Sequence, residues 1–178
     1  MTGRATWSAL IGAFGLAVSA YLTATHYFAT EVPLACSSGG IIDCEQVTTS
    51  RESSVGPVPV AVLGLCWFLV WLALIAAGRQ ANNRRLPVVQ LAWATGGLLV
   101  VFYLIYAELF LIGAICLWCT AVHASVIALF LFAVAEVSSE MTLTGEHRRS
   151  GNRRIQEGGA QHAEDDHASQ AGSQRQAL

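Results

Sequence analysis

Four long apolar stretches alternate with short polar ones along the first three-quarters of the chain. Asp, Glu, Lys and Arg are all absent from residues 5–30, 53–78, 86–107 and 109–135. A helix needs about 20 apolar residues to cross the hydrocarbon core of a membrane, and each stretch reaches that length. The pattern therefore predicts four transmembrane helices, over Trp7–Phe28, Val58–Ala77, Val88–Ile112 and Cys116–Val137.

Proline and glycine mark the expected ends of these helices. Gly56-Pro57-Val58-Pro59 and Pro87 are placed to open the second and third helices, because proline lacks an N–H that would be unpaired in a first turn. Gly78 is expected to close the second helix, and Gly113 to make a tight turn between the third and fourth. The predicted fold class is all-α, a polytopic membrane protein in which four helices form a bundle with an outer loop between helices one and two.

The composition changes after Val137. The remaining residues are rich in Gly, Ser, Gln, Arg and acidic side chains and nearly free of large apolar ones. Such a segment cannot bury enough apolar surface to fold. We therefore predict a membrane domain over residues 1–137 and a disordered cytoplasmic tail over residues 138–178. His162 and His167 flank acidic residues 164–166, and metal binding there is the alternative to a solvated tail.

Charge gives the expected orientation in the membrane. Hydrophobic residues make up 54% of the chain and charged residues only 12%, about half the charged share of a soluble domain. The first connection is mainly acidic, whereas basic residues lie before the first helix, between the second and third, and after the fourth. Both termini and the middle loop are therefore predicted to be cytoplasmic. The net charge of -2 indicates no class of partner, and nothing suggests nucleic-acid binding. The basic residues that indicate this orientation are Arg4, then Arg79, Arg84 and Arg85, then Arg148, Arg149, Arg153 and Arg154, whereas the first connection has only Arg51.

The N-terminus has a second interpretation. Arg4, the apolar stretch after it and Val18-Ser19-Ala20 are also typical of a cleavable signal peptide. The apolar stretch continues to Phe28, however, and cleavage would remove a whole helix. We therefore favour a transmembrane helix.

Four of the five cysteines fall on the predicted outer side. Cys36 and Cys44 lie in the polar first connection, while Cys116 and Cys119 form a Cys-x-x-Cys motif that shares one face at the start of the fourth helix. The positive end of the helix dipole favours the thiolate form there, and disulfides persist outside the cytoplasm. Two such pairs predict a thiol–disulfide relay, in which a flexible loop swings Cys44 toward Cys116. Cys66, within the second helix, is expected to be a small buried core residue without a role.

Three alternatives to this relay remain at this point. The Cys36–Cys44 pair is also compatible with a static disulfide. The four outer cysteines together are compatible with a structural zinc site. The whole chain is compatible with a non-enzymatic membrane protein that binds or assembles with others and carries two static disulfides.

The arrangement resembles the bacterial members of the vitamin K epoxide reductase family, which are four-helix membrane thiol oxidoreductases. A quinone-linked oxidase family has the same parts, but there the Cys-x-x-Cys precedes the loop pair, so the order in this chain favours the former. The resemblance covers residues 5–137. Many bacterial members carry a fused thioredoxin-like domain after the last helix, where this chain has the polar tail. The matching positions, in order, are Cys36, Cys44, Val47, Ser50, Gly56, Pro59, Gly64, Tyr103, Cys116 and Cys119.

The resemblance implies a direction for electron flow. An extracytoplasmic thioredoxin-fold (DsbA-like) protein would be reoxidised at Cys36, and Cys44 would pass the electrons to Cys116. Cys119 would then deliver them to a membrane quinone, menaquinone or ubiquinone. The implied location is the bacterial plasma (inner) membrane.

Two further positions follow from the resemblance. It gives Ser50 a hydrogen bond that steadies the loop or its thiolate, with a turn or helix-capping serine as the alternative. Some animal members carry an asparagine before the second helix, where this chain has Val60. Because this chain lacks that asparagine, we favour simple quinone reduction, and reduction of vitamin K-like quinones or epoxides is the alternative.

The expected quinone pocket lies around the fourth helix. His123 is one turn beyond Cys119 on the same face, and an ionisable side chain inside a membrane predicts a functional contact, here with a quinone oxygen. The alternative is a hydrogen bond to a neighbouring helix. Glu108 is a candidate for the same pocket, although a boundary carboxylate that reaches solvent is the interpretation we favour. Tyr103 and Tyr106 are expected either to line the pocket or to pack in the core.

Overall fold

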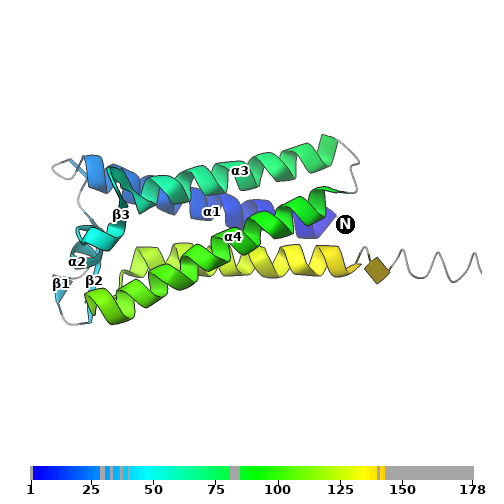
Figure 1. Cartoon of the computed structure of the whole chain (residues 1–178). Coiled ribbons are helices and arrows are strands. Elements are labelled where there is room, and N and C mark those ends of the chain that lie inside the picture. The colour runs from blue at the N-terminus through cyan, green and yellow to red at the C-terminus, as the bar shows by residue number, and fades with distance from the viewer. Residues whose placement is uncertain are drawn as a thin grey trace, which may run out of the picture. The chain divides into compact units, whose positions relative to one another are not determined.

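The computed structural model describes residues 2–28, 31–32, 34–36, 38–39, 41–80, 85–139 and 141–142. Within them, four helices are long and apolar enough to cross a membrane, and the protein is all-α and polytopic, as predicted. Helices α1, α3 and α4 run along one another (Figure 1). The four candidate spans are Gly3–Tyr27 in α1 (Thr2–Tyr27), Val60–Gly78 in α3 (Val60–Gln80), Leu86–Ile112 beginning with α4 (Leu86–Tyr106), and Leu117–Ser139.

The chain divides into two units, Met1–Val137 and Ser138–Leu178. The first unit contains all five cysteines and nearly all of the described residues. The predicted disordered tail, with the acidic cluster between His162 and His167, lies outside the described residues and stays a prediction.

The second spanning helix starts later than predicted. Val58–Pro59 forms strand β4 instead, paired antiparallel with strand β3, Ser54–Val55. Gly56 lies in the turn between them with φ 63°, in the left-handed region that glycine adopts without strain. This hairpin consumes the residues expected to open the helix, so α3 begins at Val60, and it continues past Gly78, which does not close it.

The third spanning helix changes its winding near its outer end. Helix α4 has Pro87 in its first turn, as predicted, and passes into a π-helix, η2, over Ala107–Ile112. Gly113 follows with φ 71°, and its N–H donates a hydrogen bond to the carbonyl of Glu108 at 3.0 Å. The tight turn predicted at Gly113 is confirmed, and it leads directly to the fourth spanning helix.

Short elements gather at the end of the bundle away from the N-terminus (Figure 1). Strands β1 and β2 pair antiparallel there. The Asp43 carboxylate accepts a hydrogen bond from the Gln46 N–H at 3.0 Å, which caps the N-terminus of α2. This cap makes Cys44 the first residue of a helix. The elements are β1 (Ser38–Gly39), β2 (Ile42–Asp43), α2 (Cys44–Thr48) and the 3₁₀ turn η1 (Arg51–Ser53).

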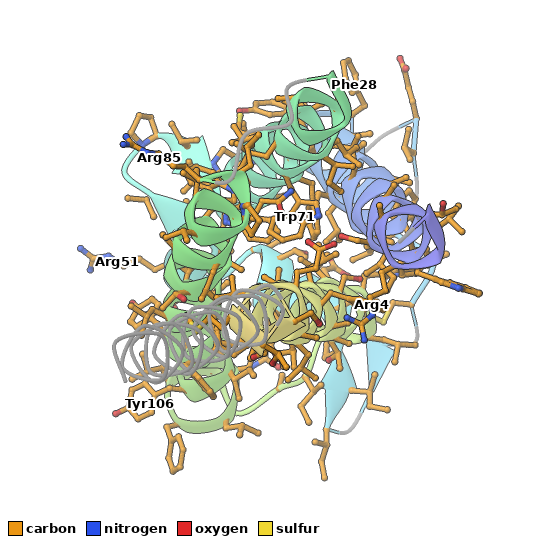
Figure 2. The ribbon with its side chains drawn as sticks, turned by 90° about the vertical axis from the view of Figure 1, so that its right-hand side faces the viewer. Arg4, Phe28, Arg51, Trp71, Arg85 and Tyr106 are labelled. Atoms are coloured by element: carbon orange, nitrogen blue, oxygen red, sulfur yellow. A yellow bond between two sulfur atoms is a disulfide. The ribbon has the colours of Figure 1, made fainter. Side chains whose placement is uncertain are left out.

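The interior of the bundle is aromatic. Phe68 and Trp71 of α3 are 0% and 2% exposed, and Trp71 lies among the helices in Figure 2. Gly12 of α1 faces Trp71, and a Cβ at Gly15 would overlap the ring of Phe68. Because lipid is as apolar as the side chains, helices in membranes associate through such close packing. Small residues of α1 therefore let α3 approach and hold one wall of the bundle.

Candidate redox site

The cysteine pair of the first loop is oxidised. Cys36 and Cys44 form a disulfide with their Cα atoms 6.0 Å apart. Cys44 is only 1% exposed, whereas Cys36 is half-buried. Of the two sulfur-bearing residues, Cys36 is thus the one that a second protein can approach.

The loop segment that carries Cys44 is joined to the segment that carries Cys116. Ile42 and Ile115, which shortly precede these cysteines, form an isolated parallel bridge. Two hydrogen bonds hold the bridge. The N–H of Ile115 donates to the carbonyl of Ile41 at 2.9 Å, and the carbonyl of Ile115 accepts from the N–H of Asp43 at 3.2 Å. Both cysteines belong to one buried cluster beyond it. The bridge thus fastens the Cys44 side of the loop to the segment that leads into Cys116 and Cys119, the inner pair. The swing of Cys44 toward Cys116 during exchange stays a prediction.

Cys116 and Cys119 stand at the start of the fourth spanning helix as free thiols. Cys116 is fully buried, and its Sγ accepts a hydrogen bond from the main-chain N–H of Cys119 at 3.2 Å. A hydrogen bond from the Cys119 side chain lowers the pKa of Cys116 most strongly, while burial acts in the opposite direction. The hydrogen bonds that Cys116 accepts therefore favour its thiolate form.

A cavity of about 860 Å³ lies beside Cys119. Its wall draws on all four spanning helices and on the loop before α3, and it is mainly apolar. Cys119 lines this cavity and Cys116 does not. The inner pair therefore has one sulfur toward the loop disulfide and one toward the cavity.

Two buried ionisable side chains line the same cavity. Glu108 is 7% exposed and His123 is 5% exposed. Neither side chain has a hydrogen-bond partner among the described residues, so both polar ends remain available to a molecule in the cavity. The interpretation of Glu108 as a carboxylate that reaches solvent is wrong, because Glu108 continues the buried face of α4, at helical spacing from Gln90 and Val101.

The two tyrosines separate. Tyr103 lines the cavity although its ring is more than half exposed. Tyr106 is not among the lining residues; its ring stacks on Phe110 with centroids 5.1 Å apart, and it lies at the edge of the bundle in Figure 2. The structure therefore brings Tyr103, but not Tyr106, to the predicted pocket.

Ser50 also lines the cavity. Its hydroxyl donates to the carbonyl of Val47 at 2.8 Å, and its own carbonyl accepts from the Ser53 hydroxyl at 2.7 Å. These bonds close the turn that follows α2. These bonds are those of the turn-serine alternative, and the role that the family resemblance implies for Ser50 stays a prediction; the described hydrogen bonds of Ser50 do not include a thiol.

Cys66 lies apart from the other cysteines. It is an exposed residue of α3 within the spanning segment, and the prediction that it is buried is wrong. The next residue, Trp67, takes the inward position and stacks on Trp71 with ring centroids 5.8 Å apart. Cys66 therefore faces lipid.

Among the described residues, no group of three or more His, Cys, Asp or Glu side chains is placed to hold a metal ion. Cys36 and Cys44 are bonded to each other and so offer no thiolates.

Trp118, between Leu117 and Cys119, makes a contact that the sequence pattern did not predict. Its indole N–H donates to the carbonyl of Ala35 at 3.0 Å, across the fold from the first loop. The position of Trp118 inside the Cys-x-x-Cys motif could have indicated this contact, because a loop that covers the motif lies within reach of its side chain.

These features define a polytopic membrane protein with a disulfide in its first loop and a thiol pair beside a mainly apolar cavity. Residues 6–134 match the model of the vitamin K epoxide reductase family, and the chain belongs to this family. The family membership supports a membrane disulfide oxidoreductase, as does the cysteine arrangement. No curated protein matches the chain.

Proposed function

We propose that this protein reoxidises an extracytoplasmic thioredoxin-fold disulfide donor and passes the electrons through two cysteine pairs to a membrane quinone. One observation carries the proposal. Cys44 of the Cys36–Cys44 disulfide shares a buried cluster with Cys116, and Cys119 lines the cavity. The cysteines thus form a continuous line from the loop surface to the bundle interior.

The thiol exchange steps follow from the exposure of each sulfur-bearing residue. A thiolate of the reduced donor attacks Cys36, forms a mixed disulfide and releases Cys44 as a thiolate; the donor's second thiol then completes its own disulfide and frees Cys36. Cys44 attacks Cys116 of an oxidised Cys116–Cys119 pair, and Cys119 leaves as a thiolate. Cys36 then attacks Cys44, so the loop disulfide closes and Cys116 is released. Two electrons and two protons have moved from the donor to the inner pair.

The cavity suits a quinone as the electron acceptor. Its mainly apolar wall fits a lipid-soluble ring, and Glu108 and His123 supply polar groups that no described residue binds. A bound quinone would take up two electrons and two protons when the Cys116–Cys119 bond closes. We assign the delivery of electrons to Cys119, because it lines the cavity, and the donation of a proton to a quinone oxygen to His123, which lines it one turn further along the helix.

The cavity wall favours a quinone over an epoxide. Val60, at the position where some animal members of the family have an asparagine, lines the cavity at the start of α3. A valine side chain cannot donate a hydrogen bond to an epoxide or hydroxyl oxygen. Menaquinone and ubiquinone both remain substrates that the wall accepts, because the contacts we assign are to oxygens that they share.

The relay also requires the loop to lie outside the cytoplasm. We expect a reporter that is active only in the cytoplasm to work when fused after Arg85, and a reporter that is active only outside to work when inserted near Ile41, an exposed loop residue. The basic middle loop and the acidic first connection support this orientation. Cytoplasmic activity at Ile41 would contradict the relay, because reducing conditions there would keep the cysteines open.

Turnover by purified protein tests the proposal. We expect the protein in detergent to oxidise a reduced thioredoxin-fold donor while it reduces a short-chain quinone, with quinone absorbance as the measurement. Cys36→Ala and Cys116→Ala should each abolish this turnover. Cys66→Ala is the matched control, since that thiol faces lipid, and it should retain turnover within a few-fold. A loop disulfide that does not exchange with the donor, together with no quinone reduction, would instead favour the static or binding alternative.

A further inference from the structure

The segment that carries Cys36 is held by two aromatic side chains from different helices. The N–H of Ala35 donates to the Tyr21 hydroxyl of α1 at 2.8 Å. The carbonyl of Ala35 accepts from the Trp118 indole N–H at 3.0 Å. Both main-chain polar groups of the residue before Cys36 are therefore bound by side chains.

The two aromatic residues also contact each other. The rings of Tyr21 and Trp118 have centroids 5.1 Å apart and are tilted by 56°, a favourable arrangement for an aromatic pair. Both are partly buried. The N–H of Cys36 donates to the carbonyl of Leu34 at 2.9 Å, which closes a three-residue turn centred on Ala35. A tight turn and two side-chain bonds thus restrain the same three residues.

Trp118 gives this contact a link to the inner pair. It lies between Cys116 and Cys119, and it packs against the buried cluster that contains Cys44 and Cys116. The Cys44 side of the loop is fastened to the inner pair by the Ile42–Ile115 bridge. Tyr21 and Trp118 fasten the Cys36 side independently.

We propose that Tyr21 and Trp118 are positioning residues that keep Cys36 beside Cys44 whenever the loop disulfide is open, and so make that disulfide close again more readily. The physical reason is effective concentration: a thiol held near its partner forms an intramolecular bond at lower entropic cost. Without the aromatic pair, the reduced Cys36 segment explores more conformations, and the dithiol form gains stability relative to the disulfide. This inference rests on the proposed relay, because only a disulfide that opens in each cycle needs such a restraint.

A redox titration of the loop pair tests the inference. The full chain in detergent is equilibrated with dithiothreitol at increasing ratios of its reduced to its oxidised form, and alkylation followed by mass spectrometry reports the state of Cys36 and Cys44. In this reaction dithiothreitol loses two electrons and two protons and the loop disulfide gains them. We expect Tyr21→Phe and Trp118→Phe each to be reduced at about fivefold lower ratio, the factor that corresponds to about 1 kcal/mol for one hydrogen bond.

Coupling and controls sharpen the result. The double variant should shift by less than the product of the single shifts, because both bonds hold Ala35. Tyr27→Phe on α1 and Trp7→Phe near the N-terminus are matched controls, since both side chains are exposed and the side-chain bonds to Ala35 come from Tyr21 and Trp118. Neither control should shift the titration. As a second measurement, the amide hydrogen of Ala35 should exchange faster in Tyr21→Phe than in the wild type, even if that variant loses stability.

The opposite results would overturn the inference. Titrations of Tyr21→Phe and Trp118→Phe that match the wild type would show that the aromatic pair does not restrain Cys36. An equal shift of the Cys116–Cys119 pair would show general loosening rather than positioning. The titration requires neither a protein donor nor a quinone, so a failure of the wild type to reduce quinone would reject the relay and leave this result readable.

Discussion

In the Cys119→Ala protein, a disulfide between Cys44 and Cys116 should accumulate as the main species, with Cys36 free. Removing Cys119 leaves Cys116 without its resolving thiol, and the loop disulfide, whose Cys44 shares a buried cluster with Cys116, is the bond that we expect its thiolate to attack. The two residues already belong to one buried cluster, and the main-chain N–H that donates to Cys116 Sγ survives the substitution. Mass spectrometry of alkylated, non-reduced peptides would identify the joined cysteines.

The rate of this trapping should depend on pH and on the residue at position 119. The Cys119 side chain lowers the pKa of Cys116 by a hydrogen bond. Cys119→Ser keeps an O–H donor, so its Cys116 should ionise at lower pH than in Cys119→Ala. Only the thiolate attacks, so trapping in both variants should speed up with rising pH, and Cys119→Ser should be faster at low pH. The two rates should converge once the pH exceeds both pKa values.

Two controls separate the relay from chance oxidation. Adding Cys66→Ala to Cys119→Ala should leave the trapped bond unchanged, because Cys66 faces lipid. Adding Cys116→Ala should remove it. Should Cys119→Ala keep only the Cys36–Cys44 bond, with Cys116 fully alkylated, the two pairs do not communicate and the static-disulfide alternative is favoured.

The helices were predictable because a membrane imposes a local rule. A segment that crosses lipid must be apolar over its whole length, so the gaps between charges predicted all four spans. The errors fell where a local signal has two outcomes. Proline at Val58–Pro59 is compatible with a helix start or an edge strand, and the positive φ of Gly56 in the structure gives the strand.

The meeting of Cys44 and Cys116 could be predicted as chemistry but not as geometry. It depends on the bridge between Ile42 and Ile115, which lie far apart in the sequence and carry no pairing signal. Glu108 shows a different kind of error. Its place near the end of a predicted helix indicated solvent, whereas its helical spacing from Gln90 and Val101 puts it on the buried face of the same helix.

Loss of the His123 side chain should slow quinone reduction by about 10²-fold, the lower end of what general acid–base catalysis contributes. His123 lines the cavity, is 5% exposed and has no hydrogen-bond partner among the described side chains and main-chain groups. It lies beyond Cys119, the last thiol of the relay. Exchange between the donor and Cys36–Cys44 in His123→Ala should therefore stay near the wild-type rate. Stopped-flow measurements that follow the donor and the quinone separately would resolve the two steps.

The neighbouring buried residues supply a comparison that isolates the imidazole. Ser125 is also 5% exposed on the same helix, but it does not line the cavity, and its hydroxyl is bonded to the carbonyl of Ala121 at 2.8 Å. Ser125→Ala should therefore leave both steps close to wild type. Glu108→Gln, which keeps the shape of a cavity-lining side chain and removes its proton exchange, should slow only quinone reduction if the carboxylate supplies or relays a proton. If His123→Ala slows both steps equally, or neither, the histidine holds helices together and takes no part in proton delivery.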